Sequence, residues 1–168
     1  MISPGGTYNL RAMKEKTPPE GGTDRQTGRV LALDLGDRRI GMAISDPLRH
    51  TARPLMTLER VSRTRDMETI REVIAEQEVA MIVVGMPLSM DGSRGRRARI
   101  TETFIDRVRG AMRIPVYEWD ERLTTVQAER VLIEGNMRRE RRREVIDQVA
   151  AVIILQSFLD AKRCDSTG

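Results

Sequence analysis

A short apolar run in the middle of the chain constrains the fold more than any other feature of the sequence. Residues 79–87, VAMIVVGMP, are uniformly apolar, rich in β-branched side chains, and end at a Gly-x-Pro stop. A strand that is apolar on both faces is typical of a sheet covered by helices on both sides. The run therefore predicts a central, fully buried strand in an α/β domain.

Four more strands and four helices are predicted around this strand. RVLALDLG and RIGMAISD lie at hairpin distance and RPLMTLER follows, so residues 29–60 are expected to form an antiparallel meander. The fifth strand is IPVYEW at 114–119. Apolar residues at helical spacing predict helices over residues 64–77, 93–112, 124–134 and 144–162.

The order β-β-β-α-β-α-β-α-α predicts a mixed five-stranded sheet with helices on both faces. It matches the ribonuclease H-like architecture, although order alone is compatible with other α/β folds. A chain of 168 residues has room for one such domain, which we place at residues 29–163. Residues 1–28, rich in Gly, Pro, Thr and charge, predict a flexible N-terminal extension, and residues 164–168 a polar tail.

Cysteine content and hydropathy exclude several classes of protein. Cys164 is the only cysteine, which rules out an internal disulfide and a cysteine-based zinc site. The longest apolar run, VAAVIIL at 149–155, is far too short to span a bilayer. The chain also lacks a signal-peptide pattern. These features predict a cytoplasmic protein without a membrane partner.

The positive charge of the chain is concentrated in two arginine runs. The net charge is only +4, and the runs are RGRRAR at 94–99 and RRERRR at 138–143. Guanidinium groups bind phosphate in a bidentate manner, so the runs predict a nucleic-acid partner. Each run is equally compatible with a solvated helix face that carries many ion pairs.

Acidic residues occur beside apolar structure at three separate places. Asp34 closes the first strand, Asp120 and Glu121 follow the fifth, and Asp147 lies inside the apolar helix EVIDQVAAVIIL. Converging carboxylates repel one another unless a cation holds them. A set without His or Cys favours Mg²⁺ or Mn²⁺, the ions that assist phosphoryl transfer. The sequence therefore suggests a metal-dependent phosphoryl-transfer site.

The same acids also have a purely structural interpretation. Asp34 would accept hydrogen bonds from turn amides, and Asp120 would cap the helix that follows the fifth strand. Asp147 would pair with an arginine from the 138–143 run. Which interpretation holds depends on whether the acids meet in space.

Four motifs together resemble the YqgF/RuvX family of pre-16S rRNA nucleases. They are LALDLGDRRIGMAISD, VVGMPLSMDGSRGRRA, DERLTTVQAE and DQVAAVIILQSFLD, and the likeness runs from about Arg29 to Lys162. The resemblance implies a ribonuclease H-like fold related to the Holliday-junction resolvases, a cytoplasmic location, and a role in maturation of the 5′ end of 16S rRNA. It also implies that Asp34, Glu121 and Asp147 are the catalytic, metal-binding acids.

The middle acid has two candidates. Strict strand alternation would put Glu118 and Asp120 on one face of the sheet and Glu121 on the other. The pattern can break where the fifth strand ends, so Glu121 is preferred and Asp120 is kept in reserve.

Several motif residues are expected to contact nucleic acid. Gly41 inside a strand suggests a close approach by a ligand, and the loop 85–95 offers backbone amides to phosphate, with Ser93 more simply a helix cap. Arg39 and Arg122 either bind phosphate or neutralise nearby acids. The full predicted set is Arg39, Gly41, Ser93, Arg94, Arg96, Arg97, Arg122, Arg138, Arg139, Arg141 and Arg142.

The function favoured by these features is a divalent-metal-dependent nuclease that acts on structured RNA, with pre-16S rRNA implied by the resemblance. One alternative keeps the site but makes branched DNA, such as a Holliday junction, the substrate. The other is a non-catalytic rRNA-binding assembly factor whose acids serve only the fold. A homodimer is compatible with the sequence, which does not fix the oligomeric state.

Overall fold

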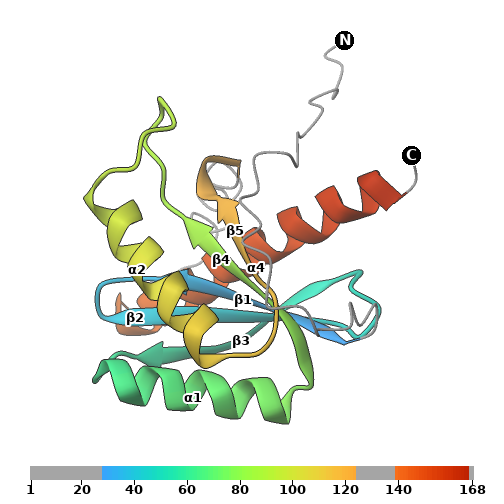
Figure 1. Cartoon of the computed structure of the whole chain (residues 1–168), viewed down its shortest axis with the longest axis horizontal. Helices are drawn as coiled ribbons and strands as arrows, with labels where there is room; N and C mark the ends of the chain where they lie inside the picture. Colours follow the sequence, from blue (N-terminus) through green and yellow to red (C-terminus); the bar gives the residue numbers. More distant parts are fainter. Residues whose placement is uncertain (1–27, 124–138, 167–168) are drawn as a thin grey trace.

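A five-stranded sheet in the order β3-β2-β1-β4-β5 forms the centre of the molecule (Figure 1). The computed structural model describes residues 28–123 and 139–166. The first three strands, β1 (Arg29–Leu35), β2 (Arg39–Ser45) and β3 (Ala52–Glu59), pair antiparallel, as expected for a meander. The strands β4 (Val79–Met86) and β5 (Val116–Asp120) run parallel to β1. The mixed sheet predicted from the element order is confirmed.

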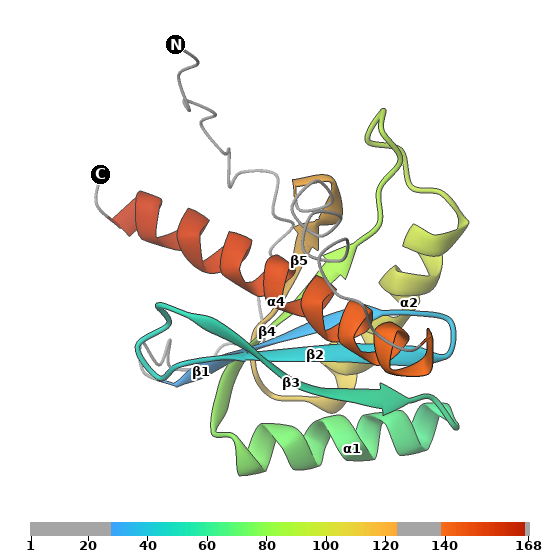
Figure 2. The same cartoon turned by 180° about the vertical axis from the view of Figure 1, so that it is seen from behind.

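Helices cover both faces of this sheet. The helices α1 (Arg63–Glu76) and α2 (Arg96–Ala111) lie on one face, and the long helix α4 (Arg139–Ser166) crosses the other, as Figure 2 shows. A single 3₁₀ turn, η2 (Glu121–Leu123), follows β5. None of the helices within the described ranges has the length and apolar character needed to cross a membrane.

Strand alternation divides the apolar side chains between two cores. On β1, Leu31, Leu33 and Leu35 pack with α1 and α2, while Val30 and Ala32 face α4. The central strand β4 contributes to both cores, as its uniform apolar run predicts. Asp34 follows the same alternation, so its side chain belongs to the α4 face of the sheet.

Several predicted boundaries differ from those of the structure. The helix α4 begins at Arg139 instead of residue 144, so most of the arginine run is helical. It also continues to Ser166, so the predicted tail from residue 164 is largely helical, with the Cys164 side chain exposed. The helix predicted over 124–134 and the N-terminal extension at 1–27 lie outside the described residues.

The capping role expected for Ser93 is wrong. The helix α2 starts at Arg96, with Gly95 at the N-cap and no side-chain cap. Ser93 instead closes a turn, in which its carbonyl accepts a hydrogen bond from the Ser89 amide at 3.0 Å. Because Ser93 belongs to this turn, the helix begins at Arg96 and not at residue 93 as predicted.

A buried acid on the opposite face fixes the β1–β2 turn that follows Asp34. Asp66, only 3% exposed in the first turn of α1, pairs with Arg60 at 3.4 Å and accepts a hydrogen bond from the Val61 amide at 3.3 Å. The Arg60 guanidinium also donates to the Gly36 carbonyl at 2.9 Å. One arginine thereby ties the turn to the start of α1.

We predict that Asp66→Ala destabilises the protein by about 2–3 kcal/mol, because it leaves Arg60 partly buried without its counter-ion. Denaturant unfolding of the variant measures this loss. Glu68→Ala serves as the control, because Glu68 is an exposed acid two residues further along the same helix. This substitution should change stability by less than about 0.5 kcal/mol. Equal effects of the two substitutions would contradict the assignment.

Candidate active site

Two acids meet at the carboxyl ends of the parallel strands. Asp34 is the penultimate residue of β1, and Glu121 directly follows β5. The two side chains share a hydrogen bond, although the strand β4 lies between β1 and β5. The contact between carboxyl groups from separate elements is the central feature of the site, and it brings together two of the three acids singled out in the sequence.

The surroundings of the pair favour a bound proton. Burial is the main cause that raises the pKa of Asp34 to about 7, and repulsion from Glu121 and Asp147 adds to it. Burial likewise raises the pKa of Glu121, and the positive charge of Arg97 opposes the shift at both acids. Near neutral pH the pair therefore holds a proton that two ordinary carboxylates would have lost.

The third acid reaches the site on α4. A Cβ atom on Gly41 would lie only 2.1 Å from the carbonyl oxygen of Asp147, so the helix backbone rests directly on β2. Register places Gly41 opposite Asp34. Ala151, one turn after Asp147, is fully buried, and its small side chain lets the helix lie close to the sheet. Burial raises the pKa of Asp147, and the charge of Arg39 opposes that shift.

One expectation for these residues requires correction. Gly41 does permit a close approach, but the backbone of α4 occupies the space that was assigned to a ligand. Among the described residues, Arg39 is the cation whose charge acts on Asp147, and the pairing of Asp147 with an arginine of the 138–143 run stays a prediction. The side chains of residues 139–143 lie outside the described part of the chain, as does all of Arg138.

The two neighbouring acids at the end of β5 have different surroundings in the structure. Asp120 accepts hydrogen bonds from the Arg122 amide at 3.0 Å and from its guanidinium at 2.5 Å. Asp120 therefore caps the 3₁₀ turn η2, whereas the helix that it was expected to cap, predicted over 124–134, lies outside the described residues. Because β5 ends at Asp120, strict alternation does not extend to Glu121, which is free to turn toward Asp34.

The predicted phosphate-binding arginines differ in whether they already form ion pairs with acidic side chains. Arg94 pairs with Glu102 and, at 3.2 Å, with Glu118. Arg122 pairs with Asp120, and Arg39 lies 3.7 Å from Glu59. Arg96 and Arg97 are exposed, as is Ser93.

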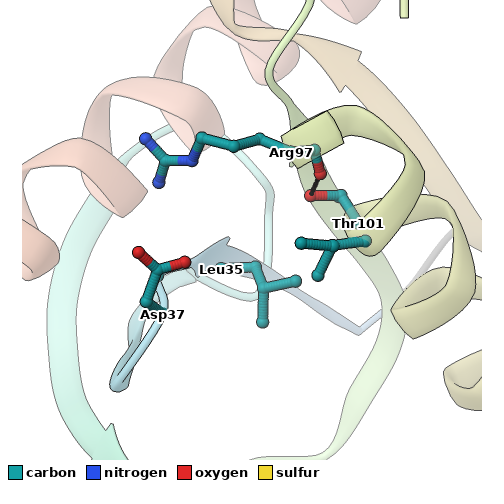
Figure 3. A pocket seen from close by; sticks show the side chains of 6 residues that line it. Leu35, Asp37, Arg97 and Thr101 are labelled. Carbon is teal, nitrogen blue, oxygen red and sulfur yellow. Dashed lines mark hydrogen bonds between the residues drawn. The ribbon is translucent and has the colours of Figure 1, made fainter. Parts of the chain in front are cut away.

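Arg97 is the arginine of this set whose charge acts on both paired acids. Among the described residues it forms no ion pair. It also lines a shallow pocket at the β1–β2 turn with Leu35, Gly36, Asp37, Ile100 and Thr101. Figure 3 shows the guanidinium of Arg97 and the carboxylate of Asp37 extending to the same side of this pocket. The charge of Arg97 thus acts on the sheet edge where Asp34 and Glu121 meet, and its guanidinium group can bind an anion there.

The donor set suits a hard divalent cation. Asp34, Glu121 and Asp147 offer only carboxylate oxygens, the ligands that Mg²⁺ and Mn²⁺ prefer. Within residues 28–123 and 139–166, no group of three or more His, Cys, Asp or Glu side chains is already arranged around a metal position. Two of the acids are in contact, and the pKa values of all three are raised, which a cation would reverse.

The fold is that of the ribonuclease H-like proteins. A solved structure of RuvC from Thermus thermophilus in complex with a Holliday junction substrate superposes with a TM-score of 0.55, covering 81% of this chain and 96% of that one at 15% identity. A second structure of Thermus thermophilus RuvC has a TM-score of 0.50 at 14% identity and covers the same shares of both chains. At these identities the likeness concerns the fold alone.

Residues 28–161 match the RuvX family, described as Holliday junction resolvase, and the chain belongs to this family. A relative from Roseiflexus sp. (strain RS-1), named "Putative pre-16S rRNA nuclease", is 48% identical over 82% of this chain and 98% of its own. One of the same name from Halothermothrix orenii is 52% identical over 79% of this chain and 94% of its own. Family membership makes the protein a hydrolase that acts on phosphodiester bonds.

The raised pKa of Asp34 predicts that the site lowers stability at neutral pH. The folded protein holds this proton up to about pH 7, whereas the unfolded chain releases it near the ordinary value of 3.8. Stability is therefore lost as the pH rises through this interval. In metal-free buffer Asp34→Asn should unfold at a higher denaturant concentration than the natural protein at pH 8, by roughly 2 kcal/mol, but not at pH 4.

Asp106→Asn is the matched control, because Asp106 is an exposed acid on α2. Its effect on stability should be small and should not grow between pH 4 and pH 8. A natural protein whose stability matches that of Asp34→Asn across this range would refute the buried, proton-sharing pair.

Proposed function

We propose that this protein is a divalent-metal-dependent nuclease that hydrolyses phosphodiester bonds in structured RNA, with precursor 16S rRNA as its substrate in the cytoplasm. The observation that carries the proposal is the contact between Asp34 and Glu121, with Asp147 on the helix above them. The names of the relatives, 46–52% identical in the examples compared, support the choice of substrate.

In this proposal Asp34, Glu121 and Asp147 hold the cation, and Arg97 and the arginines of α4 hold the nucleic-acid backbone. Bound Mg²⁺ or Mn²⁺ would activate a water molecule and stabilise the leaving oxygen. Asp34 and Glu121 would hold the cation as carboxylates, without their shared proton, and Asp147 would supply a further carboxylate from α4. Hydrolysis joins a water oxygen to phosphorus and breaks one P–O bond, which leaves a phosphate monoester and a free hydroxyl.

Branched DNA is the second candidate substrate. It is favoured by the description of the matching family as Holliday junction resolvase. The same carboxylates would serve either substrate, because the cleaved group is a phosphodiester in both. Cleavage of a four-way DNA junction compared with cleavage of a 5′ precursor segment of 16S rRNA, at equal enzyme and Mg²⁺, separates the two candidates.

We expect Asp34→Asn to reduce Mg²⁺- or Mn²⁺-dependent cleavage on the order of 100-fold or more, since it removes a charge from the proposed metal site. Binding of the RNA should persist. Gel assays of cleavage and of binding, with Asp106→Asn as the exposed-acid control, measure both. Unchanged cleavage by pure Asp34→Asn protein would reject the assignment. Binding by the natural protein without any cleavage would favour the non-catalytic assembly factor.

Arg97→Ala should weaken nucleic-acid binding and lower the slope of log affinity against log salt by about 1, the expectation for the loss of one phosphate contact. Arg71→Ala removes an exposed arginine from α1, on the face of the sheet opposite α4, and is the matched control. Filter-binding titrations at several salt concentrations supply the slopes. Equal slopes for the two variants would remove Arg97 from the proposed interface.

A further inference from the structure

Asp34 stands in a row of the sheet between two glycines. Gly41 on β2 lies directly opposite Asp34. On the other side Leu33 pairs with Val84, so the next residue of β4, Gly85, is the neighbour of Asp34. All three positions belong to the α4 face. The acid therefore has no side chain beside it from either adjoining strand.

The space over Gly85 is taken by Glu121. A Cβ atom on Gly85 would lie 2.6 Å from Glu121 Oε1, 3.1 Å from Glu121 Cγ, and 2.6 Å from Cδ1 of Ile154 on α4. Real Cβ atoms essentially never come within 3.0 Å of another heavy atom, so the two contacts at 2.6 Å could not both persist. The side chain of Glu121 thus passes over β4 through the gap that the glycine leaves, and so reaches Asp34 from β5.

We infer that Gly85 is a positioning residue for the catalytic site: its missing side chain lets Glu121 cross β4 and meet Asp34. The inference rests on the proposed function in that the pair is taken to be the metal site. Glycine in a strand interior reduces stability and leaves apolar surface unpacked, so its presence in the otherwise branched, apolar β4 needs another reason. Passage of the Glu121 carboxylate supplies that reason.

The two glycines differ in what a methyl group would meet. At Gly41 it would meet the backbone of α4 at Asp147, so Gly41→Ala would displace a whole helix. At Gly85 the three nearest atoms belong to the side chains of Glu121 and Ile154, which can rotate away. Gly85→Ala is therefore expected to fold and to move Glu121, which makes it the informative variant.

The test compares Gly85→Ala with the double variant Gly85→Ala/Ile154→Val and with Gly110→Ala. Valine lacks the Cδ1 atom that crowds the new methyl group, so the double variant removes the apolar part of the clash and leaves the acidic part. Gly110 has no atom within 4 Å of its ideal Cβ position and is the matched control. Calorimetry with Mn²⁺ alone on metal-free protein, thermal unfolding, and crystal structures of the variants are the measurements.

In Gly85→Ala we expect Mn²⁺ affinity to fall 10- to 100-fold, the usual range for loss of a supporting contact at a metal site, and the contact between Asp34 and Glu121 to be broken. The double variant should regain the lost unfolding temperature but not the Mn²⁺ affinity. Gly110→Ala should retain the affinity. Nucleic-acid binding without metal should also remain unchanged in Gly110→Ala.

Recovery of both stability and Mn²⁺ affinity in the double variant would overturn the inference, because Gly85 would then serve packing alone. An intact contact between Asp34 and Glu121 in the Gly85→Ala crystal structure would overturn it as well. If the natural protein binds no Mn²⁺, the proposed function fails, and the crystal structures still decide whether Gly85 positions Glu121.

Discussion

The close contact between α4 and the small-residue side of the sheet is the constraint on which the site depends. Gly41 and the alanines at positions 32 and 43 leave this face low enough for a helix backbone to rest on β2. Apolar residues further along α4 hold the helix there. Phe158, for example, packs edge-to-face with Trp119, with 5.7 Å between the two ring centroids. This apolar packing, together with hydrogen bonds from α4 to β3 such as that from Gln148 Nε2 to Thr57 Oγ1 at 3.3 Å, brings Asp147 toward Asp34.

Bringing the three acids together lowers the stability of the folded protein at neutral pH. Carboxyl groups that are withdrawn from water and placed beside one another resist ionisation, and the raised pKa of each acid expresses this resistance. Nearby guanidinium groups relieve it only in part: Arg97 acts on the Asp34–Glu121 pair and Arg39 on Asp147. In the free protein the negative charge of these acids is therefore only partly neutralised, and a bound cation would neutralise more of it.

Much of the architecture followed from local pattern. The apolar run of β4 indicated burial on both faces, and the spacing of Ile70 and Val73 indicated the buried side of α1, because each depends on periodicity alone. Asp34 was found as an acid out of keeping with its strand. Glu121 could be preferred to Asp120 only through the family resemblance, since the end of β5 decides which way each side chain turns.

What local pattern could not provide are contacts between distant segments. Gly85 was taken as part of a strand-ending signal, although a glycine within a branched, apolar strand is itself a sign of close approach. The ion pairs of Arg94 with Glu102 and Glu118 depend on how whole elements pack. The close approach of the α4 backbone to Gly41 does so as well. The N-terminus of α2 was misplaced because Ser93 was taken as a helix cap, although the preceding Asp91-Gly92 pair is a turn signal and the Asp91 carboxylate accepts a hydrogen bond from the Ser93 amide at 2.8 Å.

The continuity of α4 has a geometric consequence for the arginine run. Because the helix is unbroken from Arg139 through Asp147, arginines and acid are mounted on one rigid rod. At a rise of about 1.5 Å per residue, the backbone positions of the run at 139–143 stand roughly 6 to 12 Å from Asp147 along the axis. Any tilt of the helix shifts the basic run and the acid together, so the spacing between them is set by the hydrogen-bonded helix geometry and not by a hinge.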